Sequence, residues 1–201
     1  IGIVAPDLSE NNSYVGKKDP GYGYGQFWST PKLYELYTEN KDINRMNWSI
    51  APFKYTQSLG KGGAVDGREF EVGKLEEVKK QYWDQSFQYG ETEPGATIGD
   101  REKKTASKYY DRCCAKWRRE YEADKKNRNL TAINFPILRY SDVLLMIAEC
   151  ENEINAAPTD LAYDCINEVR ERAGIEVIDK GSMNTEDFRQ AVKDERAMEL
   201  C

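Results

Sequence analysis

The stretch NFPILRYSDVLLMIAECENEINAAPTDLAYDCINEVRERA, residues 134–173, decides the fold of this chain. Apolar residues return at spacings of three and four in two successive segments, which is typical of two amphipathic helices. We expect the first helix to begin near Tyr140, because Pro136 disfavours helix just before it. The predicted apolar face of this helix comprises Tyr140, Val143, Leu144, Ile147, Cys150 and Ile154.

The second helix of this stretch has its own start and stop signals. Thr159 or Asp160 can cap it after a break at residues 156–158, and Gly174 can end it. Its predicted apolar face comprises Leu161, Ala162, Cys165, Ile166, Val169 and Ala173. Small side chains fall where two antiparallel helices would approach closely, namely Ala148, Cys150, Ala162 and Cys165. The pattern predicts a helical hairpin of tetratricopeptide size that contains no obvious chemistry.

The rest of the chain is less regular. A helix is expected from Pro31, and an extended strand or hairpin arm between Trp48 and Tyr55. Residues 57–104 contain many glycines and are expected to be a variable loop region, with a short helix from Leu75 to Trp83. A last helix should begin near Thr185. The predicted fold class is mostly α, with tetratricopeptide-like helical hairpins, long irregular loops and a little β structure.

Composition excludes several classes of function. The 201 residues include 29 basic and 35 acidic side chains, a net charge of -6, which argues against a nucleic-acid partner. The chain has no histidine, so a zinc site or a histidine-dependent triad is not expected. No apolar run approaches the ~20 residues of a membrane span. Cys150 and Cys165 could face each other across the hairpin, and two buried thiols are favoured over a disulfide.

Three blocks of sequence resemble a known family when they are read together. They are NFPILRYSDVLLMIAE (134–149), INEVRERAG (166–174) and DERAMEL (194–200). In order and spacing they are similar to the C-terminal half of the SusD/RagB family of nutrient-binding outer-membrane lipoproteins of Bacteroidota. The polar positions that make up this structural signature are Arg139, Asp142, Glu149, Asn167, Arg170, Arg172, Glu195, Arg196 and Glu199.

Taken by residue type alone, these polar positions are expected to have a structural role. Buried charges need partners, because an unpaired one costs several kcal/mol. We expect Arg139 and Asp142 to form hydrogen bonds at helix ends, and Glu195 and Arg196 to connect the last helix to the hairpin.

The resemblance implies a binding protein without catalytic activity and without cofactors. Family members hold oligosaccharides, or in some cases peptides, at the outer-membrane surface and pass them to a SusC-like TonB-dependent transporter. Residues 1–201 would then be the C-terminal part of such a domain, with the family-signature helices at 139–201. The N-terminal half and its lipid anchor would lie outside this sequence. The alternative is a tetratricopeptide-like helical adaptor that binds a protein or peptide partner.

Sugar recognition needs exposed aromatic rings next to polar side chains, and three places in the sequence suit it. The preferred cluster comprises Tyr82, Trp83, Phe87 and Tyr89, because its segment matches no core element of the family. A second cluster comprises Tyr22, Tyr24 and Trp28, together with Phe27. Trp48, near Asn44 and Asn47, is the third candidate. For each place, the alternative is that the rings cap the core beneath a long loop.

Overall fold

The computed structural model describes residues 3, 5, 21, 23, 27, 29–59, 75–82, 113–122, 126, 127 and 129–201, and at 31, 54, 56–59 and 75–82 it describes the backbone alone. The chain forms two compact units. One unit joins Ile1–Pro31 with Asn47–Asn134, and the other joins Lys32–Met46 with Phe135–Cys201.

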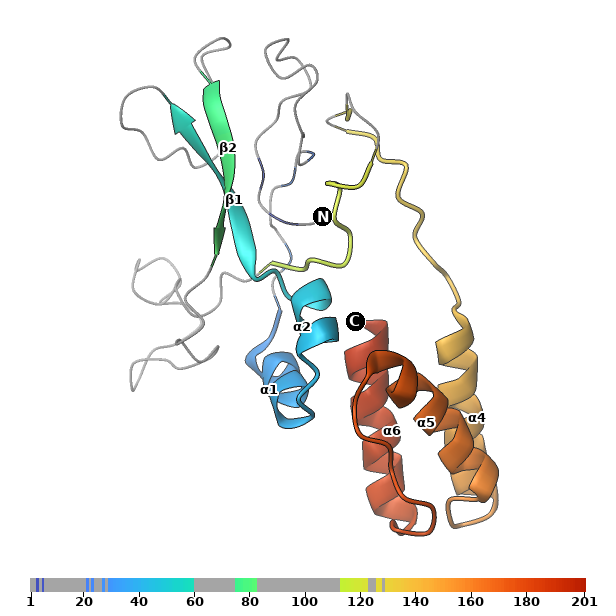
Figure 1. Cartoon of the computed structure of the whole chain (residues 1–201). Coiled ribbons are helices and arrows are strands. Elements are labelled where there is room, and N and C mark those ends of the chain that lie inside the picture. Colours follow the sequence, from blue (N-terminus) through green and yellow to red (C-terminus); the bar gives the residue numbers. More distant parts are fainter. Residues whose placement is uncertain are drawn as a thin grey trace, which may run out of the picture. The chain divides into compact units, whose positions relative to one another are not determined.

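The second unit is helical, as the sequence predicts. Its elements are α4 (Tyr140–Ile154), α5 (Asp160–Ala173), α6 (Thr185–Leu200) and most of α1 (Pro31–Glu39). Helix α2 (Ile43–Ser49) begins in this unit and ends in the first one. Helices α4, α5 and α6 pack together (Figure 1). None of the helices in the described ranges is long and apolar enough to cross a membrane.

Local sequence signals set the ends of these helices. The hydroxyl of Thr159 accepts a hydrogen bond from the backbone N–H of Ala162, 3.2 Å away, and so caps α5. Gly174 ends α5 with a φ of 76°, a left-handed conformation that glycine adopts without strain. The side chain of Asn184 accepts hydrogen bonds from two backbone N–H groups at the start of α6. The predicted boundaries of all three helices are confirmed.

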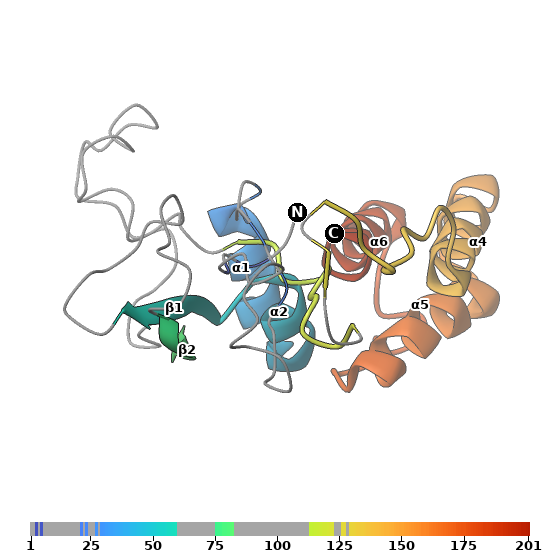
Figure 2. The same ribbon diagram turned by 90° about the horizontal axis from the view of Figure 1, so that it is seen from above.

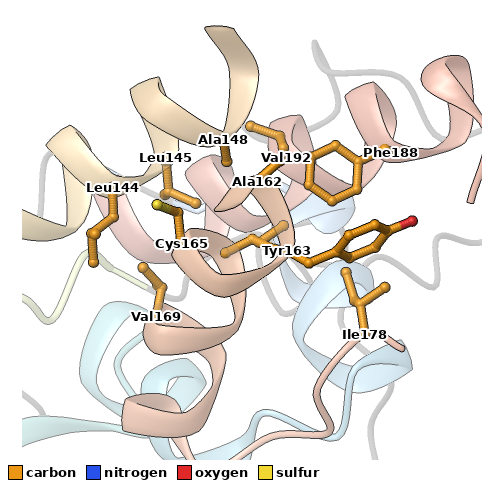
Figure 3. Close-up of a cluster of buried hydrophobic side chains, with 11 residues drawn as sticks. Leu144, Leu145, Ala148, Ala162, Tyr163, Cys165, Val169, Ile178, Phe188 and Val192 are labelled. Atoms are coloured by element: carbon orange, nitrogen blue, oxygen red, sulfur yellow. The ribbon is translucent and has the colours of Figure 1, made fainter. Parts of the chain in front are cut away.

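The core of the second unit lies between α4, α5 and α6 (Figure 3). Tyr163 and Phe188 meet edge to face with ring centroids 4.9 Å apart. The Tyr163 hydroxyl also accepts a hydrogen bond from the backbone N–H of Met183, 3.1 Å away. The buried members of this core are Leu144, Leu145, Ala148, Ala162, Tyr163, Cys165, Ile166, Val169, Ile178, Phe188 and Val192.

The predicted core-facing side of α4 is wrong. Its buried residues are Leu144, Leu145, Ala148 and Asn152. Of the predicted face, Tyr140, Ile147, Cys150 and Ile154 are exposed. The reason is that α4 is apolar on two sides, and periodicity alone cannot say which side α5 and α6 will cover. Cys150 and Cys165 therefore do not form a buried pair, since only Cys165 is buried and both thiols are free.

The first unit contains a two-stranded antiparallel ribbon (Figures 1 and 2). Strand β1 (Phe53–Leu59) pairs with β2 (Leu75–Tyr82), and Phe53 lies opposite Tyr82. The short helix predicted from Leu75 is thus a strand. Leu75, Val78 and Tyr82 have helical spacing, but backbone pairing with β1 overrides this local preference.

The extended arm predicted from Trp48 begins later than expected. Trp48 lies in the last turn of α2, which ends at Ser49, and β1 starts only at Phe53. Pro52 disfavours a helical conformation at Ala51, and this prevents α2 from continuing into the segment that leads to β1.

Segment 49–53 lies beside segment 113–115 in the first unit. The N–H of Ala51 donates a hydrogen bond to the carbonyl of Cys113 at 2.8 Å, and the N–H of Ala115 donates one to the carbonyl of Ser49 at 2.9 Å. Around this contact the buried apolar residues are Ile3, Ala51, Phe53, Cys113 and Ala115. The pairing fixes the residues that follow Ala115 next to the end of α2.

Candidate functional site

An exposed aromatic pair stands where α2 ends. The rings of Trp48 and Tyr121 stack with centroids 5.9 Å apart and planes inclined by 29°. Trp48 is 51% exposed and Tyr121 is 66% exposed. The pairing of residues 49–51 with 113–115 brings the two rings together, although they are distant in sequence. Both residues of this pair are thus largely exposed to solvent.

Arg118 holds Trp48 in place. Its guanidinium carbon lies 4.5 Å from the centroid of the Trp48 ring and 5.4 Å from that of Phe53. The guanidinium also donates a hydrogen bond to the backbone carbonyl of Asn47. A desolvated cation over an aromatic face contributes about 2 kcal/mol. With its side chain only 10% exposed, Arg118 is a largely buried support for the Trp48 ring.

A buried carboxylate supports Arg118 in turn. Glu120 lies 3.9 Å from the Arg118 guanidinium, and its other oxygen accepts a hydrogen bond of 2.7 Å from the Tyr55 hydroxyl. Burial and then the Glu120 carboxylate raise the pKa of Tyr55 well above its ordinary value. Tyr55 therefore stays protonated and remains a donor. We call Trp48, Tyr121, Arg118, Glu120 and Tyr55 the Trp48 cluster.

The Trp48 cluster suits binding better than catalysis. Flat, partly exposed rings pack against the apolar face of a ligand, and nearby amides and charged groups can satisfy its hydroxyls. The side chains of Asn44 and Asn47 lie on the same helix as Trp48. Within the described ranges, no group of three histidine, cysteine, aspartate or glutamate side chains could hold a metal ion.

Most of the other predicted ligand residues fall outside the described part of the chain. They are Trp83, Phe87, Tyr89, Tyr22, Tyr24 and Trp28. For Tyr82 only the backbone is described, and it pairs with Phe53 in the ribbon. Phe27 is exposed, and its carbonyl accepts a hydrogen bond of 2.9 Å from the N–H of Cys114. The preferred cluster around Trp83 therefore stays a prediction.

Sequence reasoning missed Tyr121 and Arg118. They lie about seventy positions after Trp48, in a polar run without a recognisable motif. Only the backbone pairing of two distant segments brings them to Trp48, and no local signal reveals that pairing.

The family-signature residues form a buried ion-pair network in the second unit. Glu195 is fully buried, and its two oxygens accept hydrogen bonds from Arg45 at 2.7 Å and from Arg170 at 2.9 Å. Asp42 is also buried, caps α2 through the N–H of Arg45, and forms an ion pair with the Arg45 side chain. Arg45 thus ties the start of α2 to α6.

Glu199 is the second centre of this network. It accepts hydrogen bonds from Arg45 at 3.0 Å and from Arg139 at 3.1 Å, and it also contacts Arg172. Arg196 of α6 lies 2.9 Å from the carboxylate of Asp142 in α4. The prediction that Glu195 and Arg196 connect the last helix to the hairpin is confirmed. Arg139 is paired at the start of α4, as expected.

Two signature residues stand apart from the ion pairs. The Asn167 amide donates to the Ile178 carbonyl and accepts from its N–H, both at 2.8 Å, and so holds the loop after α5. Glu149 is exposed on α4. The network therefore organises the scaffold, and the Trp48 cluster in the other unit is the candidate for ligand binding.

Comparison with known proteins agrees with this combination of helices and signature residues. The model of the SusD family matches residues 5–201. The chain belongs to the SusD family. A SusD-like protein of Formosa agariphila is 40% identical over 83 residues, which cover 40% of this chain and 15% of that protein.

A solved structure shows the same fold. The SusD homolog of Bacteroides thetaiotaomicron VPI-5482 superposes with a TM-score of 0.65 at 24% sequence identity. The match covers 98% of this chain and 33% of that one, so the chain spans about a third of the length of this SusD-fold relative.

Proposed function

We propose that this SusD-family chain binds an extracellular oligosaccharide, without catalysis, at the surface of the outer membrane. Membership of the family supports a nutrient-binding role in polysaccharide use. The observation that carries the proposal is the exposed stacked pair of Trp48 and Tyr121, held from below by Arg118. Pyranose rings have apolar faces that pack on such surfaces.

The wider setting of the binding event is also a proposal. The ligand would pass to a SusC-like TonB-dependent transporter, and a lipid anchor would hold the protein on the outer leaflet. In this proposal residues 57–104 are the variable loop region, and the Trp83 cluster is a further candidate for ligand binding. Family membership favours this role over that of a helical adaptor.

A screen of ligands tests the proposal. The chain is run through native gels containing neutral or acidic polysaccharides. In parallel, it is tested for binding to an immobilised peptide library. Retardation by at least one polysaccharide, with no peptide captured, is the expected result. Capture of peptides alone would reject the oligosaccharide proposal and favour the adaptor.

Substitution of Trp48 then tests the site. We predict that Trp48→Ala weakens binding of the retained polysaccharide at least tenfold, about 1.4 kcal/mol, because the stacked ring surface is lost. Tyr140→Ala is the matched control, since Tyr140 is also an exposed ring but lies in the other unit. Equal binding by Trp48→Ala and the native chain would show that the ligand lies elsewhere.

A further inference from the structure

An exposed loop shortly after the aromatic pair is fastened to its surroundings by side-chain hydrogen bonds. It comprises Asn127 and residues 129–132, and we call it the Asn127 loop. The guanidinium of Arg119 donates hydrogen bonds to the backbone carbonyls of Asn127 and Leu130, each at 2.8 Å. The same guanidinium donates a hydrogen bond of 2.7 Å to the carboxylate of Glu122. Arg119 therefore fixes both the loop and the carboxylate that precedes it.

Glu122 fastens the far end of the Asn127 loop. Its carboxylate accepts hydrogen bonds from the Thr131 hydroxyl and from the backbone N–H of Ala132, the latter at 2.9 Å. Burial alone would raise the pKa of Glu122, but the hydrogen bonds from Thr131, Arg119 and Ala132 outweigh it and lower this pKa below its ordinary value. Glu122 therefore stays ionised at neutral pH and keeps these contacts.

The Asn127 loop lies next to Tyr121 in the first unit. Tyr121 directly precedes Glu122 in the chain, and Glu122 is hydrogen-bonded to Thr131 and Ala132. These bonds bring the loop beside the backbone of Tyr121. Trp48, which stacks on the Tyr121 ring, belongs to the same unit. A fixed polar loop thus adjoins the residue that carries the more exposed ring of the pair.

The amide of Asn127 is oriented by the loop itself. Its Oδ1 atom accepts hydrogen bonds from the backbone N–H groups of Asn129 at 2.8 Å and of Leu130 at 3.0 Å. Two donors face one atom, which identifies this atom as the oxygen and leaves the NH₂ group on the other branch of the amide. Asn127 and Asn129 are both exposed. Within the described ranges, neither side-chain NH₂ group donates a hydrogen bond to the protein.

An exposed ring beside fixed amide donors suits a sugar residue. The apolar face of a pyranose packs on an aromatic ring, while the hydroxyl oxygens at its edge accept hydrogen bonds. Donors on a loop that is already ordered contribute more to affinity, because little conformational freedom is lost on binding. We propose that the amides of Asn127 and Asn129 donate hydrogen bonds to hydroxyl oxygens of a sugar residue that packs on Tyr121. This assignment rests on the oligosaccharide binding proposed above.

Asn129→Ala tests the proposal first, because the Asn129 side chain has no hydrogen bond to lose within the described ranges. The probes are xylan, mannan and pectin, each at several concentrations in native gels, and the one that retards the native chain most gives its Kd. The variant should bind this polysaccharide about fivefold more weakly, the factor that corresponds to about 1 kcal/mol of hydrogen bonding. Its free energy of unfolding in urea should not change. Asn155→Ala, at an exposed amide of the second unit, is the control and should bind like the native chain.

Two further variants separate the NH₂ group of Asn127 from its role in the loop. Asn127→Asp and Asn127→Ser both keep an oxygen that can accept hydrogen bonds from the loop backbone, but both lack the NH₂ group. Each should weaken binding about fivefold. Native affinity in Asn129→Ala, or in both Asn127 variants, would overturn the assignment.

The Trp48→Ala variant shows which proposal has failed. If it weakens binding while the asparagine variants do not, oligosaccharide binding at the aromatic pair stands and only the assignment of the amides is wrong. Retardation of the native chain by none of the three polysaccharides would overturn both proposals.

Discussion

At the scale of single residues, the second unit depends on buried carboxylates. Glu195 is fully buried between Arg45 and Arg170, and Glu199 gathers three further contacts from arginines. Such pairs do not by themselves make a protein more stable than an apolar core would. Removing one partner is nevertheless costly, because it leaves a buried charge with fewer or no groups to balance it. Most of the family-signature side chains therefore serve to pair with one another inside the helical unit.

The first residue-scale prediction concerns Glu195. We predict that Glu195→Gln lowers the free energy of unfolding by about 3 kcal/mol, because Arg170 loses its ion pair and Arg45 loses one of its three carboxylate partners. Urea denaturation measures the change, and Glu168→Gln, at an exposed site on α5, is the control. A loss no larger than that of the control would mean that the network contributes little.

The second residue-scale prediction concerns pH. Burial alone would raise the pKa of Glu199, but the Arg45 hydrogen bond and the charges of Arg172 and Arg139 outweigh it and hold this pKa below 4.5. Since the folded pKa is below the unfolded one, Glu199 stabilises the fold above about pH 4.5. This stabilisation is lost as the pH falls through the folded pKa.

Glu199→Gln is the variant that isolates this effect. Its free energy of unfolding should depend less on pH than that of the native chain between about pH 5 and pH 3. Urea denaturation over this interval measures the slope. Identical slopes for the two proteins would show that Glu199 has the same pKa folded and unfolded.

At the scale of elements, the sequence predicts the ends of helices better than it predicts which face of a helix is buried or which segment pairs as a strand. Caps and breakers lie within a few residues of the helix ends they set, so Thr159 and Gly174 predict the limits of α5 correctly. The buried side of α4 and the strand state of Leu75–Tyr82 depend on partners far along the chain. Sequence periodicity does not contain that information. Both wrong predictions have this cause.

The element-scale prediction uses the cap of α5. Thr159 accepts a hydrogen bond from the N–H of Ala162 and donates one to Glu151, 2.8 Å away. We predict that Thr159→Ala lowers the free energy of unfolding by about 1 kcal/mol, whereas Thr159→Ser, which keeps the hydroxyl, loses much less. Thermal or urea unfolding of the two variants makes the comparison. Equal losses would attribute the effect to the methyl group of threonine.

At the scale of the whole molecule, the family signature and the candidate ligand site belong to different units. The signature residues hold α4, α5 and α6 with Arg45 and Asp42, and the Trp48 cluster lies with the β1–β2 ribbon. The sequence therefore predicts the family and the helical unit well. It predicts Trp48 as a candidate from its residue type, but not Tyr121 or Arg118, which only the folded backbone brings near.

The most direct measurement of the central claim is ¹⁹F NMR of the chain labelled with 5-fluorotryptophan. The chain has four tryptophans, Trp28, Trp48, Trp83 and Trp117, and single Trp→Phe variants assign their signals. When the polysaccharide that retards the chain in the gel screen is added, we predict that the Trp48 signal shifts in a saturable way while the Trp117 signal does not move. A shift of Trp28 or Trp83 with Trp48 unmoved would contradict it.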